Sequence, residues 1–296
     1  MKTFFCPFCG KKTSYVKTTG KLPGGFNYFR CLECEGGILY PKPGKIKTEK
    51  IYVNQNYFDS LARPVRSPIL QWLLTRRIYE TPIEWITKKF KQKGKVLDVG
   101  CGNGEFLEGM KNEGWEVYGG DISSEAVRRT KNRVGKKGIL TGKFASQNFG
   151  VKLDLVCFWH ILEHTEDAKL YLDKANKTLK KGGYVTGEVP NYDSFVFRIF
   201  RENYAWIMIP DHILYFSKRS LRKVLKDGGF KKIKIYLPPR ALLNFSLSFH
   251  NYLIKRGISK IVSKPIVALS IPLSILIGGF SSIFGMGEVI RFIAKK

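Results

Sequence analysis

The sequence predicts an α/β protein: a largely parallel sheet with helices on both faces, a small N-terminal metal-binding module, and a hydrophobic helical insertion before the last strand. Three observations carry this prediction. An apolar strand at 95–99 runs through a glycine turn into a helical pattern. Four cysteines lie within the first 34 residues, and 23 residues from Pro265 to Gly287 carry no charge. Each of these segments is considered below in chain order.

Composition limits the class of protein. The 296 residues suffice for one substantial domain and a smaller one, and the 44% apolar and 25% charged residues exclude wholesale disorder. A net charge of +27 indicates affinity for a polyanion, either nucleic acid or an anionic membrane, unless the source proteome is lysine-rich throughout. Paired cysteines favour a reducing compartment, and the N-terminus lacks a signal-peptide-like apolar run, so we expect a cytoplasmic protein.

Two cysteine knuckles predict a structural zinc ribbon over residues 1–44. "CPFCG" supplies Cys6 and Cys9, and "CLECEGG" supplies Cys31 and Cys34, 21 residues further on. Each C-x-x-C turn lets two sulfurs converge on one ion, and two such turns complete a tetrahedral Zn²⁺ site with no open position for catalysis. A redox pair or four unrelated thiols are the alternatives.

Residues 45–93 are expected to form a linker and a helical lead. The linker is rich in proline around Pro43 and Pro64. Apolar residues then recur at roughly helical spacing from about Ile69 to Phe90, with Pro82 expected to interrupt the helix.

A cofactor site is predicted at "KVLDVGCGNGEF", where a strand, a glycine turn and a helix follow one another. This unit directs backbone N–H groups at a ligand beside a helix N-terminus. Asp121 follows a second strand, "WEVYGGD", 21 residues after Gly100, where a carboxylate can accept both hydroxyls of a ribose. A dinucleotide site would need Gly or Ala at the place that Glu105 occupies, so another nucleoside cofactor is indicated.

The pattern D-x-G-x-G-x-G, at Asp98, Gly100, Gly102 and Gly104, resembles motif I of class I S-adenosylmethionine-dependent methyltransferases. Three later segments, "LDLVCFWHILEHTED", "LKKGGYVTGEVPNYDS" and "DHILYFSKRSLRKVLKDGGF", follow in that family's order and are similar to its small-molecule branch, which includes ubiquinone biosynthesis O-methyltransferases. The resemblance implies a Rossmann-like seven-stranded sheet built from residues 94–237 with 288–296. Its seventh strand, "EVIRFIAKK", would run antiparallel between the fifth and sixth strands.

The resemblance also implies which residues hold S-adenosyl-L-methionine. They are Asp98, Gly100, Cys101, Gly102, Gly104, Asp121, Ile122, Ser146 and Trp159. In this family an acidic residue after the third strand often contacts the adenine amino group. This chain has "FASQNF" there, which leaves Ser146 or a backbone carbonyl for that contact.

Three of the four histidines are the catalytic candidates: His160, His164 and His212. They fall in segments that the fold places at the carboxyl ends of the strands, where such sheets bind ligands. Methyl transfer to a hydroxyl needs proton removal, which histidine can perform; His164 and His212 as structural residues are the alternative. In the quinone branch an E-x-x-E-H segment is associated with a divalent ion, and here His160 takes the first place, which leaves Glu163 and His164.

Two further patterns near the histidines have alternative interpretations. "HILEH" also matches the H-x-x-E-H zinc-protease pattern, but that chemistry needs both histidines on one helix, whereas His160 is expected to end a strand. Eight aromatic residues between Val189 and Phe216 predict either an apolar lid over the acceptor or ordinary packing.

The uncharged segment within 238–287 predicts a hydrophobic, membrane-associating helical hairpin. Because the strands on either side share one sheet, the segment must leave and return on the same side, which excludes a single crossing. Pro272 and Gly278 invite a bend in the later run, and the earlier run is short of the ~20 residues that a spanning helix needs. Flanking cations such as Lys255 and Arg256 would meet anionic headgroups. An extra helical layer or a dimer interface is the alternative.

The leading functional prediction is a methyltransferase that methylates an oxygen of a lipid-like or lipid-linked small acceptor. It would act in the cytoplasm, peripherally or monotopically attached to the inner face of an anionic membrane. The alternatives are an rRNA or tRNA methyltransferase that uses the ribbon and the basic surface, and a non-catalytic membrane scaffold. Nucleic acid is the less favoured partner, because the fourth strand lacks the Asn-Pro-Pro-Tyr and Pro-Cys segments of base methyltransferases. The sequence leaves the oligomeric state open.

Overall fold

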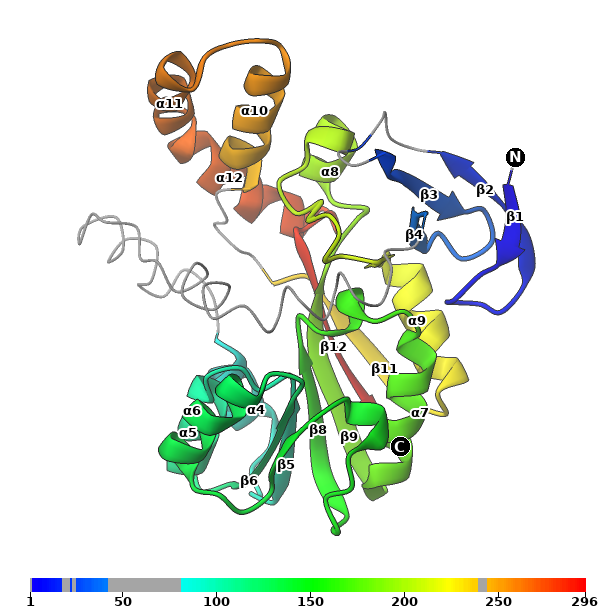
Figure 1. Ribbon diagram of the computed structural model, residues 1–296, viewed down its shortest axis with the longest axis vertical. Helices are drawn as coiled ribbons and strands as arrows, with labels where there is room; N and C mark the ends of the chain where they lie inside the picture. Colours follow the sequence, from blue (N-terminus) through cyan, green and yellow to red (C-terminus); the bar gives the residue numbers. More distant parts are fainter. Residues whose placement is uncertain (1, 18–21, 23–24, 42–80, 239–243) are drawn as a thin grey trace.

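The computed structural model describes residues 2–17, 22, 25–41, 81–238 and 244–296. Its centre is a seven-stranded sheet in the order β11-β12-β9-β8-β5-β6-β7 (Figure 1). The strands are β5 (Lys95–Val99), β6 (Glu116–Asp121), β7 (Ile139–Thr141), β8 (Leu153–Trp159), β9 (Leu179–Pro190), β11 (Lys231–Tyr236) and β12 (Val289–Lys295). The first five pair in parallel, and β12 runs antiparallel between β9 and β11. The predicted Rossmann-like α/β class is confirmed.

Helices cover both faces of this sheet, which explains why its central strands are apolar without alternation. On one face lie α4 (Pro82–Lys89), α5 (Glu105–Asn112) and α6 (Ser124–Val134); on the other lie α7 (Ala168–Thr178) and α9 (Lys218–Asp227) (Figure 1). Successive residues of β5 enter opposite cores: Val96 packs with Trp85 and Met110, and Leu97 packs with the core that contains Leu172.

Helix α4 begins where the sequence was expected to break a helix. Pro82 occupies the first turn, where its missing N–H costs nothing, and Thr81 caps the helix in a capping box with Glu84. Pro82 therefore marks the start of α4, which is where the helical pattern was expected to be interrupted. The preceding part of the predicted lead and most of the proline-rich linker lie outside the described residues.

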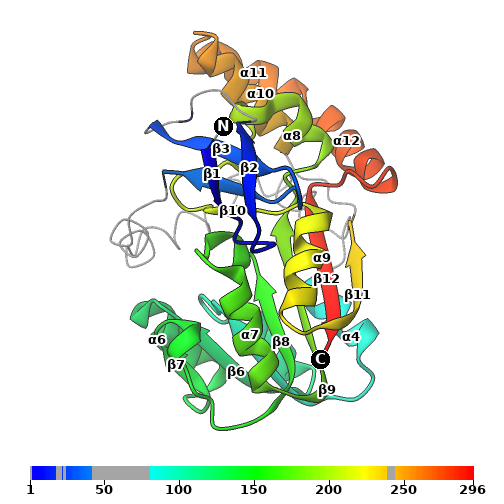
Figure 2. The ribbon, with the colours of Figure 1, turned by 90° about the vertical axis from the view of Figure 1, so that its right-hand side faces the viewer.

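The N-terminal module is joined to the main domain through a shared sheet. Strands β1 (Lys2–Phe5), β2 (Lys12–Lys17), β3 (Asn27–Cys31) and β4 (Gly37–Tyr40) pair in chain order, and β4 also pairs with β10 (Leu214–Tyr215). Leu39 N donates to Ile213 O at 3.0 Å. Figures 1 and 2 both place this small sheet beside α8 (Phe195–Phe200), at the end of the main sheet where β8 and β9 end.

Aromatic packing fills the junction between the two sheets. Tyr28 of β3 is buried, and its ring contacts those of Tyr192, Phe197 and Tyr215 at centroid distances of 6.5, 5.6 and 4.8 Å. The module predicted as a separate domain therefore shares a hydrophobic core with the segment that leads to β10.

Residues 244–283 form three helices between β11 and β12: α10 (Asn244–Lys255), α11 (Lys260–Leu269) and α12 (Ile271–Ile283). They project from the end of the sheet that also carries the small sheet (Figure 1). We call them the hairpin. Helix α10 docks on α8 and η4 (Arg201–Asn203): the Phe200 and Phe245 rings lie 5.3 Å apart, and Ala205 N donates to Ser248 Oγ at 3.0 Å.

Helices α11 and α12 carry an unusual amount of exposed apolar surface. Leu269 is 83% exposed and Ile283 is 79% exposed. The other exposed apolar side chains of this surface are Ile261, Val262, Ile266, Leu273, Leu276, Phe280 and Phe284. Among the described helices, none is by itself long and apolar enough to cross a membrane. Helices α11 and α12 meet the length and hydropathy criteria only as a pair bent by 54°.

Gly187 provides a test of the sheet's central packing. It lies on β9 between Phe158 of β8 and Phe292 of β12, and a Cβ added there would lie 2.2 Å from the Phe158 backbone oxygen. Because the sheet backbone cannot move aside, we expect Gly187→Ala to lower the free energy of unfolding in urea by at least about 1–3 kcal/mol.

The matched control is Gly279→Ala on α12, where an added Cβ meets nothing within 4 Å. Alanine is the better helix former by about 1 kcal/mol, so this variant is expected to keep or slightly raise stability. Equal stability of both variants would contradict the β8-β9-β12 arrangement.

Candidate active site

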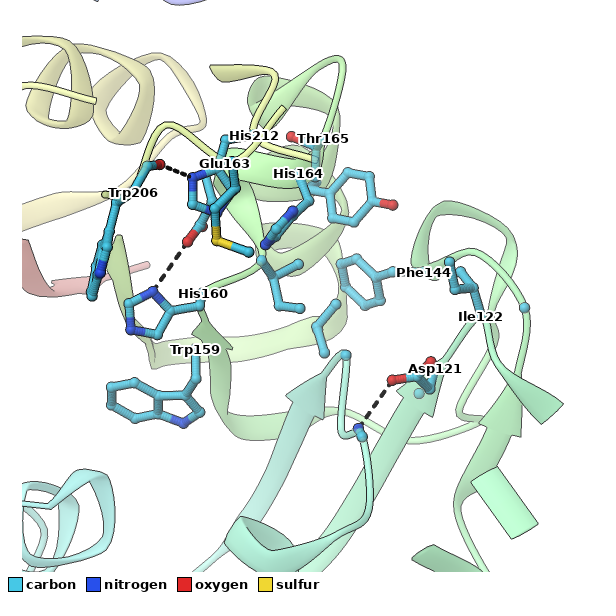
Figure 3. Close-up of a pocket in the computed structure, with 18 residues that line it drawn as sticks. Asp121, Ile122, Phe144, Trp159, His160, Glu163, His164, Thr165, Trp206 and His212 are labelled. Atoms are coloured by element: carbon cyan, nitrogen blue, oxygen red, sulfur yellow. Dashed lines mark hydrogen bonds and ion pairs between the residues drawn. The ribbon is translucent and has the colours of Figure 1, made fainter. Parts of the chain in front are cut away.

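A cavity of about 570 Å³ opens at the carboxyl ends of β5, β6 and β8. Asp121 and Ile122 lie at one end of it, and Trp159, His160 and Trp206 lie at the other (Figure 3). The remaining lining residues are Val99, Gly100, Gly102, Gly120, Gly142, Phe144, Ile161, Glu163, His164, Thr165, Tyr171, Met208 and His212. We call the two ends the cofactor end and the acceptor end.

The glycine turn forms the floor of the cofactor end. Gly100 and Gly102 have φ of 76° and 52°, which favours glycine, and a Cβ at Gly100 would lie 2.1 Å from Ile161 Cδ1. Gly102 N donates to Asp121 Oδ2 at 3.0 Å, and Ser123 N donates to Oδ1 at 2.9 Å. Burial raises the pKa of Asp121, and these two backbone hydrogen bonds oppose the shift. The turn thus holds a carboxylate at the cavity edge, which fits a ribose.

Eight of the nine predicted cofactor residues fall into two groups. Gly100, Gly102, Asp121, Ile122 and Trp159 line the cavity. The others support the turn from behind: Asp98 is buried, Cys101 Sγ lies 3.8 Å from Thr130 Oγ1, and Gly104 precedes α5. Burial, and then the charge of Asp121, raise the pKa of Asp98 well above its usual range.

Ser146 does not lie at the cofactor site. Its exposed hydroxyl donates to Lys143 O at 2.9 Å, and it is not among the lining residues. The prediction that Ser146 contacts the adenine is therefore not supported, because the 3₁₀ turn η2 (Phe144–Ser146) directs Phe144, not Ser146, into the cavity.

Gln147 was not among the predicted site residues. This buried side chain donates from Nε2 to Leu140 O at 3.0 Å and to Gly142 O at 2.9 Å. Its Oε1 lies under Gly120, where a Cβ would come within 2.1 Å. The amide thus fixes the loop after β7 against β6, and the paired glycines of "YGGD" were the only sequence signal of this close approach.

At the acceptor end, His160 is held between two carboxylates. Its Nδ1 lies 3.1 Å from Glu163 Oε1, and its Nε2 lies 3.2 Å from Glu188 Oε1. Burial alone would lower the pKa of His160, but the hydrogen bonds to both carboxylates outweigh it and raise the pKa to about 9. At neutral pH His160 is an imidazolium. The predicted catalytic role of His160 therefore cannot be that of a proton acceptor.

His164 and His212 are oriented by backbone carbonyls. Each Nδ1 faces a backbone carbonyl, Asp211 O for His164 and Trp206 O for His212, both at 2.9 Å. A carbonyl only accepts, so His164 Nδ1 carries a hydrogen. His212 Nδ1 also lies 2.7 Å from the Tyr192 hydroxyl, which donates its own hydrogen to Trp206 O at 2.6 Å, so we assign a hydrogen to Nδ1 of His212 as well. Burial, and then the charge of His164, lower the pKa of His212 to about 3, so His212 is neutral at physiological pH.

A divalent ion does not fit this end of the cavity. Glu163, His164 and His212 do bring ligand-type atoms within 4.8 Å of one another. However, Glu163 is the only carboxylate of the three, and it already pairs with the His160 imidazolium at 3.1 Å. That cation opposes the approach of a second one.

The two remaining patterns are also resolved. His160 follows strand β8, and His164 ends the three-residue 3₁₀ helix η3 (Leu162–His164), so the zinc-protease interpretation fails. Of the eight aromatic residues between Val189 and Phe216, Trp206 alone lines the cavity. Six are buried in the protein core, namely Tyr192, Phe197, Phe200, Tyr204, Tyr215 and Phe216, which favours packing over a lid.

The four N-terminal cysteines converge as a zinc site requires. The sulfurs of Cys6, Cys9, Cys31 and Cys34 all lie within 4.8 Å of one another, with Cys6 and Cys34 at 3.5 Å. A tetrahedral zinc with Zn–S bonds of about 2.3 Å places its sulfurs about 3.8 Å apart. The cluster therefore suggests a structural zinc, and no open position for a reaction is left.

Comparison with known proteins identifies the domain around this cavity. A family model described as a methyltransferase domain matches residues 74–235, more than half of the 296 residues. An uncharacterized protein of Methanocaldococcus jannaschii is 28% identical over 160 residues, which cover 53% of this chain and 74% of that protein. A ubiquinone biosynthesis O-methyltransferase of Azoarcus sp. is 25% identical over 191 residues, covering 60% and 82%.

Solved structures share the fold at lower identity. A SAM-dependent methyltransferase from Archaeoglobus fulgidus has a TM-score of 0.50 and 22% identity, covering 72% of this chain and 92% of that one. Phosphoethanolamine N-methyltransferase 2 from Haemonchus contortus, in complex with S-adenosyl-L-methionine, has a TM-score of 0.53 and 15% identity, covering 88% and 62%.

Asp121 tests the cofactor end. Replacement by Asn keeps the shape but removes the charge from the acceptor of the ribose hydrogen bonds. We expect Asp121→Asn to weaken S-adenosylhomocysteine binding by about 1.5–3 kcal/mol, roughly 10- to 100-fold, in calorimetry. Ser146→Ala is the control and is expected to leave the affinity unchanged. An equal loss in both variants would put Ser146 back in the site.

Metal content tests the N-terminal cluster. The purified chain is expected to contain about one zinc, since one tetrahedral site takes four thiolates. Cys31→Ser is expected to lose that zinc and to lower the thermal midpoint, because metal binding contributes to folding of such modules. Cys157→Ala removes a buried thiol of β8 and should keep the zinc. Full zinc content in Cys31→Ser would reject the four-cysteine site.

Proposed function

The chain belongs to the methyltransferase domain family, and we propose that it methylates a hydroxyl oxygen of a lipid-like or lipid-linked small acceptor at a membrane surface. Its general class is established: it is a class I S-adenosylmethionine-dependent methyltransferase. The proposal adds the acceptor, the acceptor atom and the location. The observation that carries it is the exposed apolar surface of α11 and α12, which belong to the same hairpin as α10, the helix that packs on α8 and η4.

The cofactor end fits S-adenosylmethionine, which supplies a methyl group on a positively charged sulfur. The glycine turn lines the cavity with the backbone of Gly100 and Gly102, and the Asp121 carboxylate can accept hydrogen bonds from the ribose hydroxyls. Phe144 and Ile122 line the same end and suit the apolar faces of an adenine. Since the leaving group is already activated, the protein's main tasks are orientation of the acceptor and removal of its proton.

His164 and His212, which both line the cavity, suit those tasks. We assign proton removal to His164, whose half-buried ring can return the proton to solvent, while the low pKa of His212 suits a hydrogen-bond acceptor that orients the hydroxyl. As the new C–O bond forms, the hydroxyl proton moves to His164 Nε2. The C–S bond breaks, and its electron pair stays on sulfur.

The location is inferred from the hairpin. A soluble helix packed on one side is polar on the other, whereas α11 and α12 expose eight large apolar side chains, and Phe284 directly after α12 adds a ninth. Lys255, Arg256, Lys260 and Lys264 lie in the same region, and no carboxylate lies between Asp227 and Glu288. Apolar burial together with these cations favours an anionic leaflet over a neutral surface.

The hairpin also connects to the acceptor end. Helix α10 contacts η4, and Lys255 pairs with Glu202 at 3.2 Å. Ala205 N donates to Ser248 Oγ, and the next residue, Trp206, lines the cavity. A membrane-bound hairpin would therefore hold the acceptor end close to the lipid surface, which supports a lipid-like acceptor.

Flotation with vesicles tests the location. The intact chain is expected to float with vesicles of anionic phospholipid. The double variant Leu269→Asp/Ile283→Asp should reduce the bound fraction at least about tenfold, since each buried side chain of this size contributes about 1.5–3 kcal/mol. Phe5→Asp, at a side chain 74% exposed on the N-terminal module, is the control and should float normally. Undiminished flotation of the double variant would remove the hairpin as the membrane anchor.

Methyl transfer into a lipid extract tests the base. His164→Ala is expected to slow transfer about 10²- to 10⁴-fold, the usual contribution of a general base, with unchanged S-adenosylhomocysteine affinity. His250→Ala changes the one histidine outside the cavity, on α10, and should transfer at the wild-type rate. A fully active His164→Ala would exclude this residue as the base.

A further inference from the structure

We infer that Arg291, Glu188 and His160 act as positioning residues: they form a buried chain of alternating charges that holds the Glu163 carboxylate at the acceptor end without a metal ion. The inference deepens the proposed function, because it concerns the end of the cavity at which we place the methyl acceptor. It also goes against the divalent ion that the quinone branch associates with this segment.

The chain starts inside the sheet. Arg291 of β12 and Glu188 of β9 are direct cross-strand neighbours, and Arg291 Nε donates to Glu188 Oε2 at 2.9 Å. Both side chains are 1% exposed. The guanidinium also lies over the rings of Trp85 and Trp159, at 5.3 and 5.8 Å from their centroids. Loss of either partner of such a buried pair would leave an uncompensated charge inside the protein, which is strongly destabilising.

Glu188 then holds His160 through two contacts. Its backbone carbonyl accepts from His160 N at 2.9 Å, and its Oε1 lies 3.2 Å from His160 Nε2. The His160 backbone has a φ of 54°, which is uncommon for a residue with a side chain. This strained turn directs the ring toward Glu163, so that Nδ1 reaches Glu163 Oε1 at 3.1 Å (Figure 3).

Charge balance explains why the four groups occur together. Two cations, Arg291 and His160, alternate with two anions, Glu188 and Glu163, and three of the four side chains are almost fully buried. Of the groups around His160, Glu163 comes from η3 and Glu188 from β9. His164 and His212 each bring a ring nitrogen within 4.8 Å of a Glu163 carboxylate oxygen. The imidazolium supplies the positive charge beside Glu163 that a bound ion would otherwise supply.

The arrangement leaves one carboxylate oxygen for the acceptor. Among the described residues, Glu163 Oε2 has no hydrogen-bond partner, although Glu163 is fully buried beside the cavity. A buried oxygen of this kind is costly unless a ligand pairs with it. A donor group on the methyl acceptor, near the hydroxyl oriented by His212, would meet that requirement.

Histidine NMR on the full chain tests the inference directly, because the chain has only four histidines. In wild type, the ¹⁵N signals of His160 are expected to remain those of an imidazolium through neutral pH and to titrate near pH 9. Glu188→Gln should lower the His160 pKa by about 1–3 units, the usual effect of losing an adjacent opposite charge. Glu166→Gln, at an exposed carboxylate on the same loop, is the control and should leave it unchanged.

Mn²⁺ tests whether a divalent ion binds at the acceptor end. Added to the zinc-loaded protein, this paramagnetic ion should leave the His164 and His212 signals as sharp as that of His250. Selective broadening of the two cavity histidines would overturn the inference. So would a wild-type His160 that loses its proton near its ordinary pKa.

The wild-type titration shows whether His160 is an imidazolium at neutral pH even if Glu188→Gln fails to fold. The double variant Glu188→Gln/Arg291→Met then removes both members of the buried pair and is expected to show the same lowered His160 pKa. Neither readout requires turnover. A failure to methylate lipids would therefore count against the proposed function and leave the titration result intact.

Discussion

The antiparallel insertion of β12 between β9 and β11 is the constraint on which the rest of the structure depends. Its pairing with β9 runs from Val289 opposite Pro190 to Lys295 opposite Tyr184. Because β11 and β12 lie in one sheet, the intervening residues must return to the sheet edge from which they left. The same strand places Arg291 opposite Glu188 and so fixes the buried charges behind the acceptor end.

Both peripheral modules are attached to the segment between β9 and α9, which contributes Trp206 and His212 to the acceptor end. The hairpin reaches it through Glu288, whose Oε2 accepts from Tyr204 at 2.8 Å and from Asn244 at 3.1 Å. The N-terminal module reaches it through β4, which pairs with β10 immediately after His212. Neither attachment touches the glycine turn, so the cofactor end is built by the sheet alone. The acceptor end is shaped by all three parts of the molecule.

The sequence predicted the parts of the structure that depend on local pattern. The apolar strands and the glycine turn follow from short motifs, Asp121 from its distance to that turn, and the antiparallel last strand from the resemblance to the methyltransferase family. The contacts that distinguish this protein join distant segments instead. Glu188 contacts His160 although the two are 28 residues apart in the sequence, and Leu39 of the N-terminal module donates a hydrogen bond to Ile213. No period or spacing encodes such contacts.

The protonation states of the histidines could not be predicted from the sequence either. His160, His164 and His212 look alike as residues near strand ends, yet two carboxylates keep the first charged while burial keeps the third neutral. Ser146 shows the same limit at the cofactor end, because its side chain direction depends on a 3₁₀ turn that the pattern "FASQNF" does not specify.

The central claim is that a membrane-bound class I methyltransferase acts on a lipid-like acceptor. In the most direct measurement, the full chain is incubated with methyl-labelled S-adenosylmethionine and a mixture of anionic lipid extract and total RNA. The lipid and RNA fractions are then separated and counted. The account predicts that the label is found in the lipid fraction, as the methyl group of a methyl ether. Label in the RNA, or cofactor binding with no transfer to either fraction, would contradict it.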